Sequence, residues 1–137
     1  MTNQLPKAPE AIGNYVTFKK AGNFIYTSGH IPAGENNFFG KIPSQVSIDD
    51  GYKAASYCAE LTLATLKENC DVEKLQPLNV VGFINAELGF KDHAKVLNGF
   101  TDKLSEFFSE KATRSAVGVQ SLPLDVCVEV QCIFIYE

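Results

Sequence analysis

Two ionisable side chains, Arg114 and Glu129, stand in or beside an otherwise apolar C-terminal stretch. The planar guanidinium of arginine offers paired donors that fit a carboxylate, where lysine offers only a point charge. A glutamate between valines must be paired, solvated by a cavity, or raised in pKa. In a pocket of low dielectric constant it can orient or deprotonate a water molecule. The pair therefore predicts a site for a small organic acid and a water molecule.

Each of the two residues also has a structural interpretation. Arg114 can be a solvated cation at a strand end, and Glu129 can be an ion on an edge strand or at an interface. The sequence contains no GxSxG, P-loop, GxGxxG or HExxH motif. Any chemistry is therefore limited to charge neutralisation, orientation and the activation of water.

Four weaker candidates lie elsewhere in the chain. Ser28 and Gly29 directly follow a predicted strand, and glycine there lets the backbone approach a ligand closely. Tyr15 can be a packing residue or part of a site, and Asn98 lies beside the apolar stripe of a predicted helix. With two histidines, to which no role is assigned, and no CxxC spacing, the sequence predicts no metal site.

The C-terminal stretch is predicted to form a hairpin. Val117–Val119 begins the first strand, Leu122–Asp125 makes a proline turn, and Val126–Tyr136 forms the second strand. Side chains alternate between the faces of a strand, and both faces of the second strand are largely apolar. This pattern predicts a central strand that is covered on both sides.

The rest of the chain predicts two more strands, a long loop, and two helices separated by a strand. Ser47 is expected to cap the first helix, and Pro77 is expected to end the link before the third strand. The elements are strands Asn14–Phe18 and Asn23–Ser28 around a turn at Lys19–Gly22, loop Gly29–Ser47, helix Ile48–Asn69, strand Leu78–Asn85 and helix Lys91–Glu110.

The order β-β-α-β-α-β-β predicts a two-layer α+β domain, with both helices on one face of an antiparallel-rich sheet. One domain is expected to span residues 1–137. No segment is left over to cover the other face of the sheet. Self-association is therefore the simplest way to bury it.

Composition excludes several classes of function. A net charge of −4 argues against binding of nucleic acid through contacts with its phosphates. No apolar run is long enough to span a membrane, and the N-terminal residues lack the apolar core of a secretory signal. The four cysteines sit among apolar neighbours, which favours buried reduced thiols in a cytoplasmic protein.

Four segments, in this order, resemble the Rid (YjgF/YER057c/UK114) family, also labelled endoribonuclease L-PSP. AIGNYV is similar to its N-terminal Ala-Ile-Gly-x-Tyr element, and FIYTSGHIP to its Thr-Ser-Gly-Gln-x-Pro strand end. KVLNGFTDKLSEFF resembles the helix with the family asparagine, and RSAVGVQSLPLDVCVEV the segment with its arginine, Leu-Pro turn and glutamate. The resemblance covers roughly Ala11 to Phe134.

The resemblance implies a chorismate-mutase-like fold and a homotrimer whose sheets form a central barrel, with ligand sites in the clefts between subunits. It implies a cofactor-free deaminase that hydrolyses 2-enamine or 2-imine acids, such as 2-aminoacrylate, to a 2-ketoacid and ammonia. The residues implied are Arg114 for the substrate carboxylate, Glu129 for the attacking water, the backbone of Ala116 for the imine nitrogen, and Tyr15, Ser28, Gly29 and Asn98 for the walls.

The chain departs from the family pattern at two positions. Ala116 stands where archetypal members have cysteine, and His30 stands where they have glutamine. The departures keep a second hypothesis open, that of a trimer which binds or senses a small carboxylate without turnover. A third, an endoribonuclease or translation inhibitor, is disfavoured by the acidic composition and the lack of a basic-aromatic patch.

Overall fold

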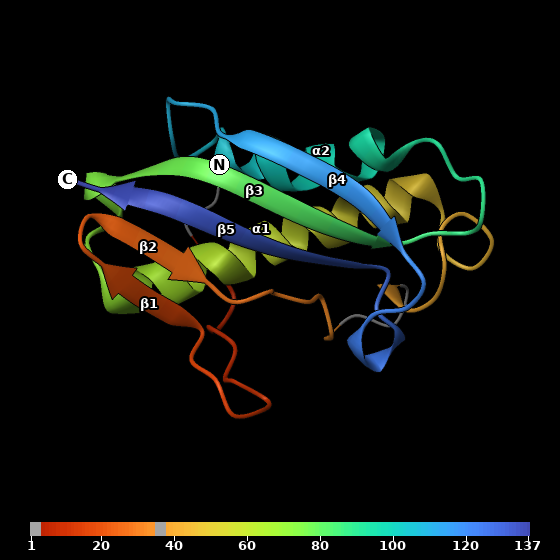
Figure 1. The fold of residues 1–137 in the computed structure, drawn as a ribbon, viewed down its shortest axis with the longest axis horizontal. Coiled ribbons are helices and arrows are strands. Elements are labelled where there is room, and N and C mark those ends of the chain that lie inside the picture. Colours follow the sequence, from red (N-terminus) through yellow and green to blue (C-terminus); the bar gives the residue numbers. More distant parts are fainter. Residues whose placement is uncertain (1–3, 35–37) are drawn as a thin grey trace.

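The computed structural model describes residues 4–34 and 38–137. Within these ranges the chain forms one five-stranded sheet and two long helices, both behind the sheet in Figure 1. The two-layer α+β prediction is confirmed. The elements are β1 (Phe18–Ala21), β2 (Phe24–Thr27), α1 (Ile48–Asn69), η2 (Val72–Lys74), β3 (Leu75–Asn85), α2 (His93–Leu104), β4 (Thr113–Val119), η3 (Pro123–Asp125) and β5 (Val128–Tyr136).

The sheet has the strand order β1-β2-β5-β3-β4, so β5 is the central strand, as its sequence predicted. Neighbouring strands are antiparallel except β3 and β4, which run parallel because α2 crosses back over the sheet between them. The predicted C-terminal hairpin is wrong, because β3 lies between β4 and β5 and pairs with both. The proline turn at η3 therefore connects two strands that do not pair.

The first helix has the predicted bounds. The Ser47 hydroxyl accepts a hydrogen bond from the Asp50 amide at 3.0 Å and caps the first turn of α1. The second helix is shorter than the predicted Lys91–Glu110, because the chain tightens into turns after Leu104. Phe108 nevertheless remains in the core, with its ring centroid 5.7 Å from that of Phe134.

The N-terminal hairpin forms, but its strands are shifted from the predicted bounds. The turn falls at Gly22 and Asn23, where Gly22 has a positive φ of 60° that suits a tight turn. Tyr15 therefore lies in the loop before β1, not in a strand. The third strand begins at Leu75 rather than at Leu78, because a bulge accommodates Pro77 within it.

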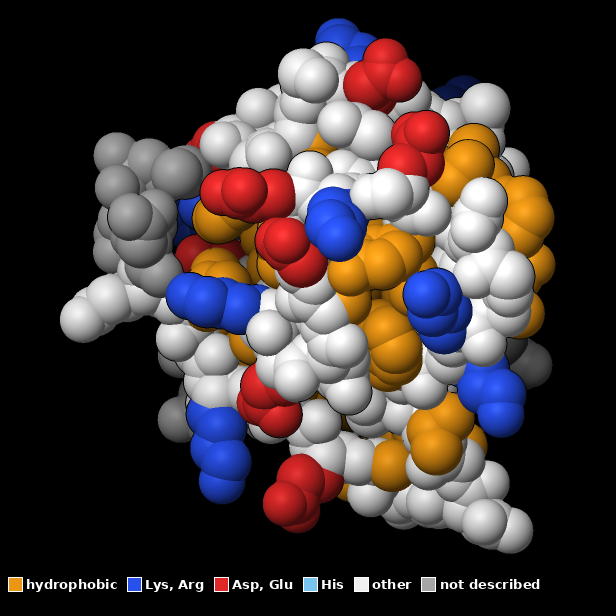
Figure 2. Space-filling model, turned by 90° about the vertical axis from the view of Figure 1, so that its left-hand side faces the viewer, with side chains coloured by type: hydrophobic (Ala, Val, Ile, Leu, Met, Phe, Trp, Pro, Cys, Tyr) orange, Lys and Arg blue, Asp and Glu red, His pale blue; other side chains and the backbone are white. Residues whose placement is uncertain are grey.

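The two faces of β5 have different surroundings. Val128, Val130, Cys132 and Phe134 are buried against the helices, whereas Glu129, Gln131, Ile133 and Ile135 lie on the open face of the sheet. Phe24 and Tyr26 of β2 and Val117 of β4 are also exposed there. Figure 2 shows hydrophobic side chains along its right-hand margin, the side of this open face. The expected uncovered apolar face is present.

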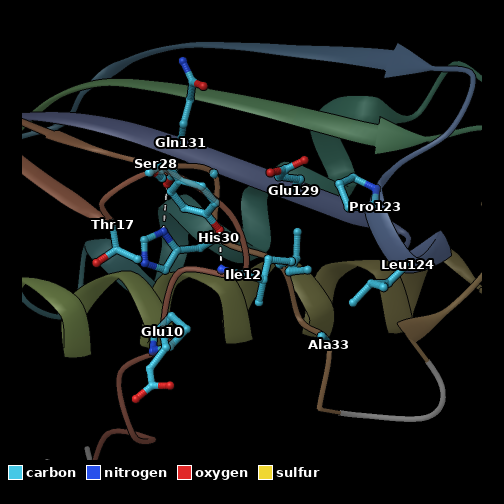
Figure 3. Close-up of a pocket in the computed structure, with 14 residues that line it drawn as sticks. Glu10, Ile12, Thr17, Ser28, His30, Ala33, Pro123, Leu124, Glu129 and Gln131 are labelled. Carbon is cyan, nitrogen blue, oxygen red and sulfur yellow. Dashed lines mark hydrogen bonds between the residues drawn. The ribbon is translucent and has the colours of Figure 1, made fainter.

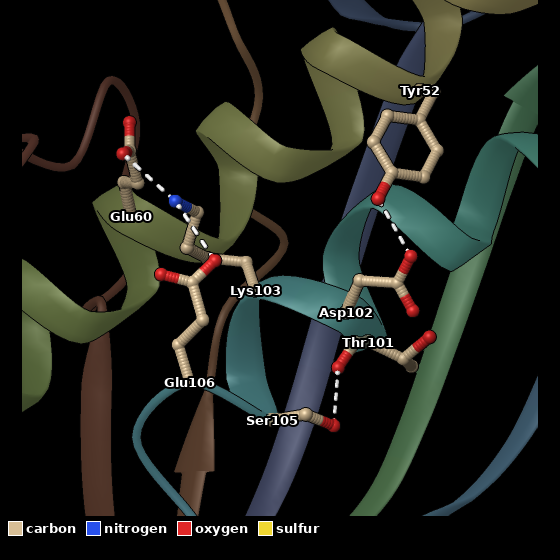
Figure 4. A network of polar contacts seen from close by, with 7 residues as sticks. All are labelled: Tyr52, Glu60, Thr101, Asp102, Lys103, Ser105 and Glu106. Carbon is tan, nitrogen blue, oxygen red and sulfur yellow. Dashed lines mark hydrogen bonds and ion pairs between the residues drawn. The ribbon is translucent and has the colours of Figure 1, made fainter. Parts of the chain in front are cut away.

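Close contact between the two helices depends on Gly99. A β-carbon at this position would lie 2.8 Å from the carbonyl carbon of Tyr52 and would overlap its oxygen. Polar side chains flank the crossing: the Tyr52 hydroxyl donates to Asp102 at 2.6 Å, and Lys103 lies 3.6 Å from Glu60 (Figure 4). Only glycine lets the backbones approach this closely.

We expect Gly99→Ala to lower the free energy of unfolding by about 2 kcal/mol, because a clash with backbone of about 3 kcal/mol exceeds the gain in helix propensity of about 1 kcal/mol. Urea unfolding measures this difference. The control is Lys95→Ala, an exposed position on the same helix, which should change stability by less than about 0.5 kcal/mol. A Gly99→Ala variant as stable as the native chain would contradict the prediction.

None of the helices in the described ranges is long and apolar enough to cross a lipid bilayer. The four cysteines are unpaired; three are buried, and Cys70 is partly exposed. Burial raises the pKa of the Cys127 thiol to about 12, which keeps it protonated and unreactive.

Candidate functional site

Four of the predicted site residues line one cavity of about 560 Å³ beside the central strand. They are Tyr15 from the N-terminal loop, Ser28 and Gly29 from the end of β2, and Glu129 from β5. Figure 3 shows Glu129 between Ser28 and Pro123, with its carboxylate projecting away from β5. Segments more than 100 residues apart in sequence thus meet at this cavity.

Glu129 is half-buried, and burial raises the pKa of its carboxyl group. Within residues 4–34 and 38–137 the carboxylate has no hydrogen-bond or ion-pair partner. It rests directly against Gly29, where a β-carbon would lie 2.8 Å from the carboxyl carbon of Glu129. Gly29 therefore allows the carboxylate to occupy this place. A carboxylate with free lone pairs in a partly desolvated cavity can accept a proton from water.

Hydrogen bonds tie the N-terminal loop to the end of β2. The Ser28 hydroxyl donates to the Val16 carbonyl at 2.5 Å, and the Ser28 amide donates to the Thr17 carbonyl at 3.1 Å. The Tyr15 hydroxyl accepts from the Ile12 amide at 3.3 Å and so closes a small turn. These bonds hold Tyr15 at the rim of the cavity, where its ring is partly exposed.

His30, to which no role was assigned from the sequence, lines the same cavity. It is 2% exposed, and its Nδ1 donates to the Ser28 carbonyl at 2.9 Å. Its Nε2 accepts from the Thr65 hydroxyl of α1 at 2.8 Å. Burial lowers the pKa of His30, so the ring is neutral. It fixes the Ser28–Gly29 corner to α1. The one feature of the sequence that could have indicated this role is the position of His30 directly after Gly29.

We expect the free energy of unfolding to fall as the pH is lowered below about 6.5, the usual pKa of histidine, because the unfolded state then binds a proton that folded His30 resists. This contribution can reach about 1.4 kcal/mol per pH unit. His30→Gln keeps a donor for Ser28 and an acceptor for Thr65 but cannot titrate. The free energy of unfolding, measured with urea between pH 7.5 and 5, should therefore depend less on pH in His30→Gln than in the native protein. An equal slope in the native protein and in His30→Gln would refute the prediction.

Arg114 and Asn98 line a second cavity, of about 310 Å³, between α2 and the edge strand β4. The Arg114 guanidinium donates to the Thr101 hydroxyl of α2 at 3.0 Å. Within the described ranges no carboxylate lies within 4.0 Å of it, although Asp102 and Glu110 line the same cavity. Its remaining donors are therefore available for an external carboxylate.

The two cavities lie on opposite sides of the sheet. Arg114 pairs with Val80, which faces the helices, whereas Glu129 pairs with Phe83, which faces the open side. Two strand spacings (roughly 9.6 Å) and three residues along β3 (roughly 10 Å) separate the positions. Ala116 is on the same side of β4 as Arg114 and lines neither cavity. One chain therefore does not bring all seven predicted residues together.

Neither cavity is built to hold a metal. Among residues 4–34 and 38–137, no three histidine, cysteine, aspartate or glutamate side chains are grouped closely enough to bind an ion. The carboxylate of the first cavity and the guanidinium of the second instead suit an organic anion and water.

Comparison with known proteins identifies the family of the chain. The family model described as endoribonuclease L-PSP matches residues 5–136. The chain is 30% identical to protein TCP17 of Trypanosoma cruzi, over 95% of this chain and 86% of the relative. It is 29% identical to the 2-iminobutanoate/2-iminopropanoate deaminase of Escherichia coli, over 92% of this chain and 90% of the relative.

A solved structure of Escherichia coli TdcF with bound serine superposes with a TM-score of 0.69 at 27% identity, covering 99% of this chain and 100% of that one. Its similarity supports the fold over the whole length. Together with the family model, which spans nearly all of the sequence, these matches show that the chain belongs to the Rid family, the family described as endoribonuclease L-PSP.

Proposed function

We propose that the protein hydrolyses reactive 2-enamine or 2-imine acids to a 2-ketoacid and ammonia, without a cofactor. The observation that carries the proposal is Glu129, a half-buried carboxylate without a partner among the described residues, in a cavity with Tyr15, Ser28 and Gly29. The name of the 29% identical deaminase from Escherichia coli, which refers to 2-imino acids, supports the substrate class.

We further propose that the site is completed by a second copy of the chain, in a homotrimer. Arg114 and Glu129 of one chain face opposite sides of the sheet, so one small acid cannot contact both. A neighbouring copy can supply the missing partner where its β4 edge approaches the Glu129 cavity. Association of this kind would bury the apolar open face, which includes Phe24, Tyr26 and Val117, and the hydrophobic effect therefore favours it.

In the proposed reaction Arg114 holds the substrate carboxylate, and Glu129 takes a proton from water as the oxygen bonds to C2 of the imine. The Ala116 backbone contacts the imine nitrogen, and Asn98 supports the wall of the cleft. Proton transfer to nitrogen then allows the C–N bond to break. Imine and water together give ketoacid and ammonia, so the charge on Glu129 is restored at the end. Desolvation and fixed charges lower the barrier.

A second candidate function is binding of a small carboxylate without turnover. The TdcF structure with bound serine, an amino acid held by a relative, favours keeping this candidate. Both candidates predict that a 2-ketoacid raises the melting temperature, and that Glu129→Ala still binds it. Only the enzyme predicts turnover by the native chain. Cleavage of RNA is disfavoured by the net charge of −4.

The deciding experiment generates 2-aminoacrylate in situ and follows the formation of pyruvate with and without the protein. The proposal expects formation to be faster with the protein, in proportion to its concentration. A rate equal to that in buffer, with a ketoacid still raising the melting temperature, would support the binding function instead.

A further inference from the structure

The cavity beside Glu129 is lined by both polar and apolar side chains. Ser28, Tyr15 and Glu129 are among the polar ones, and Ile12, Ala33 and Leu124 are among the apolar ones. In Figure 3 these three lie to one side of Glu129, away from Gln131. A three-carbon acid placed at Glu129 is too small to cover these apolar side chains as well.

The backbone at Leu124 adopts an unfavourable conformation. Leu124 and Asp125 have positive φ values of 57° and 63°, a region that side chains other than glycine, asparagine and aspartate rarely adopt. The Leu124 side chain is 63% exposed, so burial in the core does not compensate. Such strain is retained where the surrounding structure enforces it, and it clusters at ligand sites.

Hydrogen bonds enforce the turn from both sides. The buried Asn85 side chain donates to the Asp125 carboxylate at 3.2 Å and to the Val126 carbonyl at 3.2 Å. The Gly40 amide donates to the Asp125 carbonyl at 2.7 Å. A polar network anchored on the buried Asn85 thus holds the turn that presents the exposed Leu124 to the cavity.

The size of the cavity agrees with a larger ligand. In a single chain it measures about 560 Å³, within the range of pockets that bind ligands much larger than a three-carbon acid, and so leaves room for the approaching edge of a neighbouring copy. We propose, resting on the imine hydrolysis above, that the substrate is a 2-imino acid with a bulky apolar side chain, branched or aromatic, which packs against Leu124 and Ile12. The carboxylate and C2 of the substrate stay next to Glu129.

Binding of 2-ketoacids tests this preference independently of turnover. Each buried methylene is worth about a four-fold gain in affinity, so 4-methyl-2-oxopentanoate should bind at least about ten-fold more tightly than pyruvate. Isothermal titration of the intact protein measures both. Equal affinities, or tighter binding of pyruvate, would overturn the proposal whether or not the protein is an enzyme.

Leu124→Asn assigns the preference to the proposed residue, because asparagine tolerates a positive φ and removes the apolar surface. The affinity ratio of the two ketoacids should fall by about ten-fold in this variant. Leu88→Asn, at a fully exposed leucine in another cavity, should leave the ratio unchanged. An unchanged ratio in Leu124→Asn, with native melting temperature, would overturn the role of Leu124.

Turnover separates this proposal from the proposed function. The imines of alanine and leucine, generated in situ by amino-acid oxidation, should both be hydrolysed, with kcat/KM at least about ten-fold higher for leucine. Hydrolysis without this preference overturns the present proposal and supports the deaminase. A ten-fold preference in binding without hydrolysis of either imine supports the apolar preference and overturns the deaminase.

Discussion

Glu129→Gln is expected to lower kcat for imine hydrolysis by on the order of 10²–10⁴-fold, the usual contribution of a general base. Glutamine has nearly the same shape but cannot accept the proton that water must lose. Because glutamine fills the same space against Gly29, the affinity for a 2-ketoacid should remain within about two-fold. Steady-state kinetics and titration with ketoacid measure the two quantities separately.

The pH dependence of the native protein gives a second readout of the same group. Burial raises the pKa of Glu129, and only the ionised form can accept a proton. The kcat should therefore fall as the pH is lowered, and the fall should begin at a higher pH than for an exposed glutamate. In the folded state the proton is bound more tightly, so this group's contribution to stability is lost as the pH rises through the raised pKa.

The matched control for this variant is Glu73→Gln, at an exposed carboxylate of η2 outside the Glu129 cavity. It removes the same charge and should leave kcat unchanged. If Glu129→Gln retained kcat within about three-fold of the native value, Glu129 could not be the base.

The elements with local signals could be predicted from the sequence. The bounds of α1 follow from the Ser47 cap and an apolar stripe, both of which lie within the helix or next to it. The central place of β5 follows from apolar residues on both of its faces. By contrast, the pairing of β4 with β3 depends on contacts between distant segments. A proline turn between two strands indicated a hairpin, and nothing local showed that β3 would lie between them.

The same distinction explains what could be predicted of the site. Glu129 and Gly29 were both candidates, but their contact depends on how the end of β2 meets β5, which the sequence does not reveal. His30 was missed because its role comes from Thr65 of α1, a partner 35 residues away. That Arg114 faces the helices could not be deduced either, since polar and apolar residue types do not alternate along the sequence of β4.

Arg114→Ala is expected to lower kcat/KM for a 2-imino acid by on the order of 10²-fold, because about 3 kcal/mol of charge-assisted hydrogen bonding to the carboxylate is lost. Arg114→Lys should recover only a part of this, since lysine keeps the charge but not the paired donors. The fold should persist, because the Arg114 side chain makes one hydrogen bond, to Thr101, and no ion pair within the described ranges. Kinetics of both variants on one imine measure the effect, and native kcat/KM in Arg114→Ala would contradict it.

Mixing the two inactive variants should restore activity, because Arg114 and Glu129 of one chain lie on opposite sides of the sheet. In mixed assemblies of the proposed trimer, a cleft that takes Arg114 from a Glu129→Gln chain and Glu129 from an Arg114→Ala chain is complete. With random assembly in a cyclic trimer this holds for about a quarter of the clefts, so co-expression should recover about a quarter of the native activity. Each variant expressed alone should remain inactive. If the co-expressed variants showed no more activity than either alone, the two side chains could not act in one cleft shared by neighbouring copies.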